Sequence, residues 1–224
     1  ETEIVHLSDI DIKPCVGCLS DNQASCRVPC ALDDGMREAY DKILESDGLV
    51  IATPVYWFAP TGLLKNFLDR LTALENMVFV SGRSLLEGKV AGVIAVGNDS
   101  GSVMAASYIM VVLNQMGVLV PPWALAYHNS PAPVDENRGV LIDSANVGSI
   151  VARTAKLLAD KGVKEWYRAS VAWLDDSLAL IKKRLERERG FQWNARKAVV
   201  EKLLKARHPP FLPPRERLSR PRER

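Results

Sequence analysis

Short apolar segments alternate with amphipathic segments between residues 2 and 160 of the chain. Apolar runs bounded by turn signals predict strands at Thr2–Leu7, Gly48–Ala52, Lys89–Val96 and Val118–Leu125. Stripes at helical spacing predict helices at Asp34–Ser46, Thr61–Leu74, Met104–Met116 and Asp143–Asp160. The last strand contains Pro121-Pro122 and is expected at a sheet edge, because proline cannot donate to a ladder. Strands that alternate with helices predict an α/β fold with a doubly wound parallel sheet.

Residues 48–70 join a buried strand, an aromatic loop and an amphipathic helix. Thr53-Pro54 is expected to end the strand, because proline lacks an N–H group and restricts the residue before it. Tyr, Trp and Phe follow at 56–58, and Thr61 is the expected N-cap of the helix. Ligands of open α/β sheets bind where strands end, and this loop suits a flat apolar ring with a polar edge. The alternative is that these residues bind no ligand and only pack the strand against the helix.

All four cysteines, Cys15, Cys18, Cys26 and Cys30, lie in one predicted loop with the spacing C-x2-C-x7-C-x3-C. Four soft thiolates suit a [4Fe-4S] cluster or a Zn²⁺ ion. A loop of free thiols remains an alternative, and disulfides are the least favoured interpretation in a reducing compartment. The sequence therefore marks a candidate metal site and leaves the metal open.

Other polar residues are assigned structural roles. His128 is expected just after the last strand, where we favour a locally hydrogen-bonded loop histidine over a contact to substrate. Lys65 and Asp69 have i, i+4 spacing and predict a surface or subunit contact. The chain has no evident Ser-His-Asp arrangement, paired-carboxylate pattern or P-loop, so no catalytic side chain is predicted.

Charge divides the chain into an acidic body and a basic tail. Residues 1–150 contain 9 Lys and Arg and 18 Asp and Glu, whereas residues 151–224 contain 20 and 9. Helical spacing predicts a long helix at 166–185 and a second helix at Asn194–Arg207. The Pro- and Arg-rich residues 208–224 are expected to be a disordered, solvated tail, because they cannot build a core and carry no nucleic-acid recognition motif.

Composition places the chain among globular proteins, with 47% apolar and 25% charged residues. No apolar stretch approaches the roughly 20 residues that span a bilayer, and the charged start is unlike a signal peptide. We therefore expect a cytoplasmic protein with neither a membrane nor a nucleic-acid partner. Its expected divisions are a body at 1–162, a helical extension at 163–207 and the tail at 208–224.

The segment TPVYWFAPTGLLKNFLDR, which starts at Thr53, resembles the isoalloxazine-binding loop and following helix of NADPH-dependent FMN reductase-like flavoproteins. The resemblance covers about residues 1–160 and implies a flavodoxin-like fold. It implies that the flavin ring is bound by Thr53, Pro54, Val55, Tyr56 and Trp57, and its polar edge by Gly97, Asn98, Asp99, Ser100 and Gly101.

The same resemblance implies the activity of an FMN-dependent oxidoreductase. FMN would accept electrons from NAD(P)H, or from a protein donor, and pass them to a small-molecule or protein acceptor. The flavin carries the chemistry in such proteins, which agrees with the lack of a predicted catalytic side chain. The family commonly forms dimers or tetramers, so a homo-oligomer is expected.

The start of the chain departs from the family pattern. The segment ETEIVHLSDIDIKPC resembles the family's second strand and the loop after it, and no Gly/Ser/Thr-rich phosphate loop precedes it. We therefore expect an N-terminally incomplete sheet that lacks its central strand, or a rearranged sheet in which Thr2–Leu7 takes that place. A cofactor-free interaction module, stapled by a metal at its cysteines, is the alternative function.

The cysteine loop resembles that of iron-sulfur flavoproteins in position but not in spacing. Those proteins place a compact cysteine motif before an acidic helix start, which corresponds here to Asp33-Asp34. Their third cysteine follows soon after the second, whereas residues 19–25 intervene here. The spacing therefore leaves the ligand assignment in question.

Overall fold

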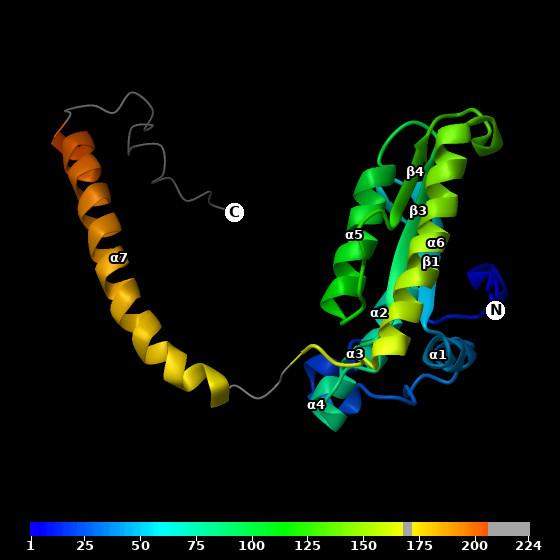
Figure 1. Cartoon of the computed structure of the whole chain (residues 1–224), viewed down its shortest axis with the longest axis horizontal. Coiled ribbons are helices and arrows are strands. Elements are labelled where there is room, and N and C mark those ends of the chain that lie inside the picture. The colour runs from blue at the N-terminus through cyan, green and yellow to red at the C-terminus, as the bar shows by residue number, and fades with distance from the viewer. Residues whose placement is uncertain (168–171, 206–224) are drawn as a thin grey trace, which may run out of the picture. The chain divides into compact units, whose positions relative to one another are not determined.

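A computed structural model describes residues 1–167 and 172–205 of the chain. By their internal contacts the residues form two units, Glu1–Ala169 and Ser170–Arg224. The first is an α/β unit, and the second contains the helix α7 (Ala172–Lys205) (Figure 1). The predicted tail at 208–224 lies outside the described residues.

The α/β unit contains four strands, β1 (Gly48–Tyr56), β2 (Ala59–Pro60), β3 (Val90–Gly97) and β4 (Leu125–Asn129). Its α-helices are α1 (Met36–Glu45), α2 (Gly62–Arg70), α3 (Thr72–Glu75), α4 (Met77–Ser81), α5 (Ser102–Gln115) and α6 (Arg138–Lys161). Single 3-10 turns lie at Leu7–Asp9, Cys18–Ser20, Gln23–Ser25 and Val134–Glu136. None of these helices, nor α7, is long and apolar enough to cross a membrane.

The sheet has the order β2-β1-β3-β4, in which β1, β3 and β4 are parallel and β2 is antiparallel. β1 pairs with β3 from Gly48↔Val90 to Pro54↔Val96, and β3 pairs with β4 up to Gly97↔Asn129. This register brings the carboxyl ends of all three parallel strands to one edge of the sheet, which confirms the predicted α/β class and the predicted edge position of the last strand.

Helices cover the two faces of the sheet differently. The larger core lies on one face, where residues of α1, α2 and α5 pack against β3. On the other face α6 runs along the strands (Figure 1), and its Val151 packs against Val90. Gly92 permits this close approach, because a Cβ atom there would lie 2.5 Å from Val147 Cγ1. β3 is therefore the central strand of the described sheet.

β1 is less well covered than β3. Gly48 faces α6, and Val50, two residues later, lies on the same face of the sheet. Val50 is 44% exposed, and Ala52 and Pro54 are exposed as well. Along Gly48–Pro54, β3 is the only strand paired with β1 in the part of the chain that the structure describes. An apolar strand therefore lies at a sheet edge with one face open.

Two strand predictions at this end of the sheet are wrong. Thr2–Leu7 pairs with no described strand, is exposed up to His6 and enters a 3-10 turn at Leu7, so it does not fill a place in the sheet. β1 does not end at Ala52 but continues through Thr53-Pro54 to Tyr56. Proline is tolerated there because the strand is at the edge of the sheet.

The predicted last strand is displaced toward the C-terminus. Leu119 makes a single bridge to Val90, and the chain then turns at Pro121–Trp123 before β4 begins at Leu125. The prolines thus interrupt the pairing that was predicted to run through them. His128 consequently lies within β4 and not after it.

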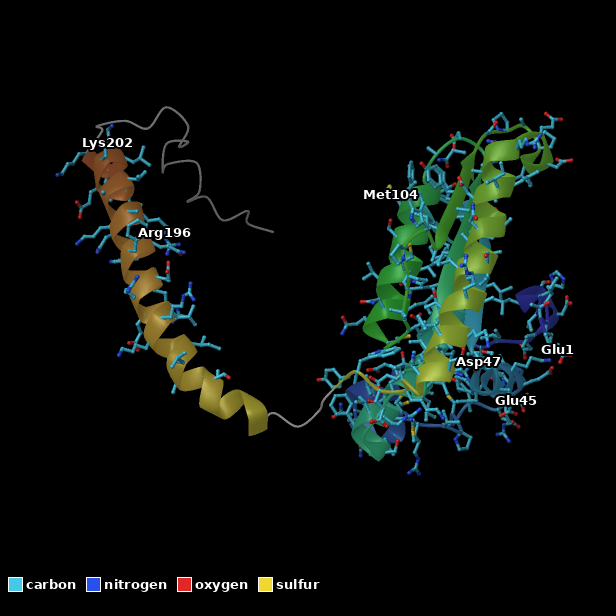
Figure 2. All side chains as sticks on the ribbon, viewed as in Figure 1. Glu1, Glu45, Asp47, Met104, Arg196 and Lys202 are labelled. Atoms are coloured by element: carbon cyan, nitrogen blue, oxygen red, sulfur yellow. The ribbon has the colours of Figure 1, made fainter. Side chains whose placement is uncertain are left out.

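Three helix predictions also change. The helix expected at 61–74 is divided into α2 and α3, although Thr61 is its N-cap as predicted, accepting a hydrogen bond from Leu64 N at 3.2 Å. α6 begins at Arg138 and not at Asp143, because the side chain of Asn137 caps it. The tail forms one described helix, α7, where two were expected, and Gly190 does not interrupt it. Its basic side chains, such as Arg196 and Lys202, project from the ribbon (Figure 2).

The segment between α6 and α7 lies on the α/β unit as far as it is described. Glu87 accepts hydrogen bonds from the backbone N–H groups of Trp166 at 3.3 Å and Tyr167 at 2.8 Å. The Trp166 indole N–H donates to the Gly117 carbonyl at 3.0 Å. The spacing of Trp166 had suggested that it belongs to a helix. It lies outside the helices and instead anchors the connecting segment.

Candidate functional site

An aromatic turn closes the hairpin between β1 and β2. Tyr56 pairs with Ala59, so Trp57 and Phe58 form a two-residue turn, with φ angles of 49° and 64°. This combination of positive φ angles is the primed geometry that fits the twist of a hairpin. Both residues carry a side chain in the left-handed region, which is a strained conformation and one that clusters at functional sites.

The predicted glycine loop lies against this turn. Gly101 has φ of 89°, and a Cβ atom there would lie 2.8 Å from Phe58 Cδ1 and 2.9 Å from Phe58 Cα. Only glycine allows this approach, because no real Cβ atom has such short contacts. The residue that directly follows the predicted segment 53–57 thus contacts the predicted segment 97–101 at the carboxyl edge of the sheet.

The side chains of the aromatic segment differ in exposure. Trp57 is 93% exposed and Tyr56 is also exposed, whereas Val55 is half-buried. Thr53 is buried, and its hydroxyl donates to the Pro54 carbonyl at 2.8 Å. The segment therefore offers aromatic surface at its tip and no free hydroxyl at Thr53.

The glycine loop offers backbone groups and short polar side chains. Asn98, Asp99 and Ser100 are exposed, and Ser100 Oγ donates to Asp99 Oδ1 at 3.3 Å. Met104 projects from the first turn of α5 beside this loop (Figure 2). These groups can contact a bound ring without the help of a charged catalytic residue.

Sequence reasoning missed the side chains that hold the glycine loop from β4. Asn129 Oδ1 accepts a hydrogen bond from the Ser102 backbone N–H at 3.2 Å and so caps α5, whose own N-cap residue, Gly101, supplies no side-chain bond. Ser102 Oγ donates to the His128 carbonyl at 2.8 Å. The Ser130 N–H donates to the Gly97 carbonyl at 3.0 Å. A cap from a distant strand has no local sequence signal, because all known cap patterns are short-range.

His128 is a structural residue in this arrangement. It is buried, its Nε2 is 3.2 Å from the Ala132 carbonyl, and its Nδ1 is 3.4 Å from Asn137 Nδ2. Both ring nitrogens are therefore occupied locally, as favoured from the sequence. Lys65 and Asp69 form the predicted pair on the partly exposed surface of α2, with Nζ to Oδ1 at 2.5 Å.

The four cysteines line a second candidate site, remote in the sequence from the loops. Cys15, Cys18, Cys26 and Cys30 all face one pocket with a cavity volume of about 20 Å³, and none of them forms a disulfide. Burial, and to a smaller extent the neighbouring Cys18, raise the pKa of the Cys26 thiol to about 12. Within the described ranges, no three potential ligands are close enough to hold an ion as they stand. The donor set suits a thiolate-bound metal, but the sulfurs must close on it.

A buried ion pair forms one wall of this pocket. Arg70 is 2% exposed, and its Nη1 is 2.6 Å from Asp34 Oδ2 and 3.0 Å from the Lys13 carbonyl. Its Nη2 is 3.1 Å from Asp34 Oδ1, whereas its Nε has no hydrogen-bond partner. The sequence had shown Arg70 only as the neighbour of Asp69 and Asp34 only as part of a helix start.

Asn76 anchors the cysteine loop to the helices α3 and α4. Its side-chain nitrogen donates to the Gln23 carbonyl at 2.8 Å and to the Cys26 carbonyl at 2.6 Å. Asn76 is itself buried at the junction of α3 and α4. The loop is therefore held by protein contacts as well as by its cysteines.

Comparison with known proteins decides the family. The family model for NADPH-dependent FMN reductase matches residues 1–131, which is more than half of the chain. The chain belongs to the NADPH-dependent FMN reductase family. This agrees with the resemblance of the segment that starts at Thr53 to the flavin-binding loop of that family.

Relatives of this FMN reductase-family chain include proteins named for iron and sulfur. An "Iron-sulfur flavoprotein" of Archaeoglobus fulgidus is 30% identical over 153 residues, which is 68% of this chain and 64% of that protein. A second from the same organism is 32% identical over 112 residues, 50% of this chain and 52% of that protein. The "Putative NAD(P)H-dependent FMN-containing oxidoreductase YwqN" of Bacillus subtilis is 30% identical over 107 residues, 46% and 59%. The chain thus spans about half to two thirds of the length of these three relatives.

A solved structure shows the same fold. RosB, with the bound intermediate 8-demethyl-8-formylriboflavin-5'-phosphate, superimposes with a TM-score of 0.59 over 82% of this chain and 73% of RosB, at 21% identity. This FMN reductase-family chain therefore has the flavodoxin-like α/β fold that was expected.

Proposed function

We propose that the chain binds FMN at the carboxyl ends of β1 and β3 and transfers electrons from NAD(P)H, or from a protein donor, to a small-molecule or protein acceptor. The observation that carries this proposal is the contact between Gly101 and Phe58, which joins the aromatic turn and the glycine loop into one surface. Family membership and the printed name of the Bacillus subtilis relative support FMN and NAD(P)H.

In this proposal the chain's own residues position the cofactor. Thr53, Pro54, Val55, Tyr56 and Trp57 line the flat ring, and Gly97, Asn98, Asp99, Ser100 and Gly101 present N–H groups and short side chains to its polar edge. When bound, FMN supplies the ability to accept a hydride or single electrons. Asn129 and Ser102 keep the glycine loop in place from β4 and α5. No side chain is assigned a proton-transfer role.

The remaining parts of the proposal concern organisation. The body at 1–162 is the flavin-binding part, and the extension at 163–207 serves homo-oligomer assembly. The four cysteines hold a metal, either a [4Fe-4S] cluster or Zn²⁺, because their thiols share one pocket. We place the protein in the cytoplasm, where such thiols stay reduced.

A ring-binding assay with a matched pair of tryptophan variants tests the flavin site. Trp57 and Trp123 are 93% and 86% exposed, and both have positive φ angles, of 49° and 66°. Trp123 precedes β4 and therefore lies at the opposite end of the parallel strand from the proposed site. Both FMN and lumiflavin, which has the ring without the phosphate, are titrated against the chain by flavin fluorescence.

We expect Trp57→Ala to weaken binding of both flavins about tenfold, since an aromatic stacking contact contributes about 0.5 to 1.5 kcal/mol beyond the area it buries. Trp123→Ala should leave binding unchanged. Equal effects of the two substitutions would contradict the placement of the ring at the aromatic turn. If the unaltered chain binds neither flavin, the cofactor-free interaction module takes the place of the oxidoreductase.

A further inference from the structure

We propose that two copies of the chain pair through the outer face of α5, with the two α5 helices antiparallel. This adds a surface of the α/β unit to the homo-oligomer part of the proposed function, on which it rests, and it does not depend on flavin binding. The outer face of α5 consists of five exposed residues, Val103, Met104, Ser107, Tyr108 and Val111.

α5 is apolar on both of its sides. Its inner side packs into the unit through fully buried residues, Ala105, Ala106, Ile109 and Leu113. On the outer side Met104 projects from the ribbon (Figure 2), and Val111 is 69% exposed. A helix that is apolar all round is normally covered on all sides. The outer face of α5 therefore has the composition of a contact surface.

The apolar surface continues beyond α5. Phe58 touches Gly101, the residue directly before α5, and both Phe58 and its neighbour Trp57 are exposed. A fully exposed aromatic side chain offers about 150 to 250 Å². Together with the outer face of α5, the two rings form an apolar surface larger than the few hundred Å² that monomeric proteins usually expose. It approaches the roughly 800 Å² that one partner buries in a standard interface.

Charge favours a second copy as the occupant of this surface. Residues 1–150 contain 18 acidic and 9 basic side chains, so two α/β units repel each other where charged surfaces meet. No Asp, Glu, Lys or Arg occurs from 100 to 134, the stretch that contains α5. The outer face of α5 is therefore a surface on which two such units can meet without like charges in contact.

The neighbouring charges on α2 are already paired. Asp69 raises the pKa of Lys65, and Tyr108 of α5 does so to a smaller extent, which places the Lys65–Asp69 pair beside the outer face. An anionic membrane or an acidic protein is attracted by unpaired basic side chains. The described surface around α5 offers no such group, so an uncharged partner surface like its own fits it better.

The order of large and small side chains fits an antiparallel pair. Ser107 lies in the middle of the outer face, four residues after Val103 and four before Val111. Two helices related by a two-fold axis at Ser107 can approach closely, because its side chain is small. Val103 of each copy then lies against Val111 of the other. The face is thus complementary to itself, as a two-fold interface requires.

Sedimentation velocity of the full chain tests this surface with three glutamate variants. Val111→Glu places a charge on α5, Leu157→Glu on α6 at the opposite face of the sheet, and Leu180→Glu on α7; the three side chains are 69%, 56% and 80% exposed. We expect the unaltered chain to be a dimer. Its dissociation constant should rise at least about 100-fold in Val111→Glu, because like charges meet in the interface, and should stay nearly unchanged in Leu157→Glu.

The same experiment separates this surface from the extension. Loss of the dimer in Leu180→Glu but not in Val111→Glu would leave assembly to the extension and overturn the proposal for α5. A chain that is monomeric at all concentrations would overturn both assembly proposals, while the flavin titrations would still decide the oxidoreductase. Equal losses in Val111→Glu and Leu157→Glu would also contradict a specific surface on α5.

Two opposite charges at one position test the two-fold arrangement. Ser107→Glu and Ser107→Lys should each weaken self-association, because like charges meet at the axis, whereas an equimolar mixture of the two should restore a dimer. Restoration also shows that both variants are folded. A mixture that dissociates as readily as either variant alone would overturn the crossing at Ser107.

A measurement on the unaltered chain does not depend on any variant. Val103 and Val111 lie eight residues apart on one helix, which is about 12 Å along its axis and too far for a nuclear Overhauser effect within one copy. In a dimer of ¹³C-labelled and unlabelled copies, we expect intermolecular effects between these two side chains. A dimer without them would contradict the antiparallel pairing of α5.

Discussion

Replacing Asp34 by asparagine is expected to destabilise the α/β unit by about 3 to 5 kcal/mol. The side chains of Asp34 and Arg70 are 0% and 1% exposed, and the Nη1–Oδ2 distance is 2.6 Å. Asp34 also accepts from the backbone N–H of Lys13 at 2.9 Å and of Met36 at 3.2 Å. Removing one member of a buried pair leaves the other charge without compensation, which costs about 3 to 5 kcal/mol.

The adjacent residue provides the control. Asp33 is exposed, and its contact with Arg37 at 3.4 Å is a surface pair, so Asp33→Asn should change stability by about 0 to 1 kcal/mol. Urea unfolding at neutral pH, followed by tryptophan fluorescence, measures both variants. Equal, small losses for the two substitutions would refute the reasoning that burial makes the Asp34 pair important.

The same pair predicts a dependence on pH. Burial alone raises the pKa of Asp34, but hydrogen bonds from Arg70 and from the Lys13 amide outweigh it, so the pKa is lowered overall. The stabilisation is therefore fully present above the unfolded-state pKa of about 3.9 and is lost as the pH falls through the lower folded-state value. The difference in stability between the chain and Asp34→Asn should shrink over this acidic window, whereas a constant difference would contradict the assignment.

Three further contacts are tested by substitution. Gly92→Val should lower the free energy of unfolding by about 1 to 3 kcal/mol, because the new Cβ would lie 2.5 Å from a methyl group of α6. Gly148→Ala is the control, since a Cβ there meets nothing within 4 Å, and it should be neutral or stabilising. Thermal melts measure both variants. Asn129→Ala should cost about 1 kcal/mol and speed hydrogen exchange of the first amide of α5, which loses its cap; unchanged exchange would exclude that role. Glu87→Ala should speed exchange across residues 163–167 and leave α5 unaffected, and uniform protection would show that this carboxylate does not anchor the segment.

Local signals in the sequence predicted the parts of the fold that depend on near neighbours. Thr61 was found as a cap because its partner, Leu64 N, is three residues away. The alternation of apolar and amphipathic segments gave the α/β class, and the carboxyl-edge position of both loops follows from parallel strands. Boundaries failed where tertiary context overrode a local rule. Pro54 remains in β1 because the strand is at an edge, and β4 begins later because its chain turns at Trp123 first.

The site was predicted as segments and not as contacts. Gly101 was predicted as a flavin contact because it is small. Its contact with Phe58, which lies 43 positions earlier, could not be predicted from the spacing of residues. The same holds for Arg70 and Asp34, and for the cap that Asn129 provides to α5. Such pairs require the topology to be known first. The roles of the predicted flavin contacts stay predictions, to be decided by the tryptophan pair.

The hydrogen bonds of Asn76 hold the backbone of the cysteine loop without the help of a bound metal. In small zinc domains the unfolded chain has no site, so the metal's binding energy is spent on folding and a chelator denatures the protein. Here the carbonyls of Gln23 and Cys26 are already held by a buried side chain of the helical layer. We therefore expect the loop to keep its backbone path whether or not its cysteines bind a metal. Binding at the cysteines, if it occurs, would then be read out without unfolding of the loop that carries them.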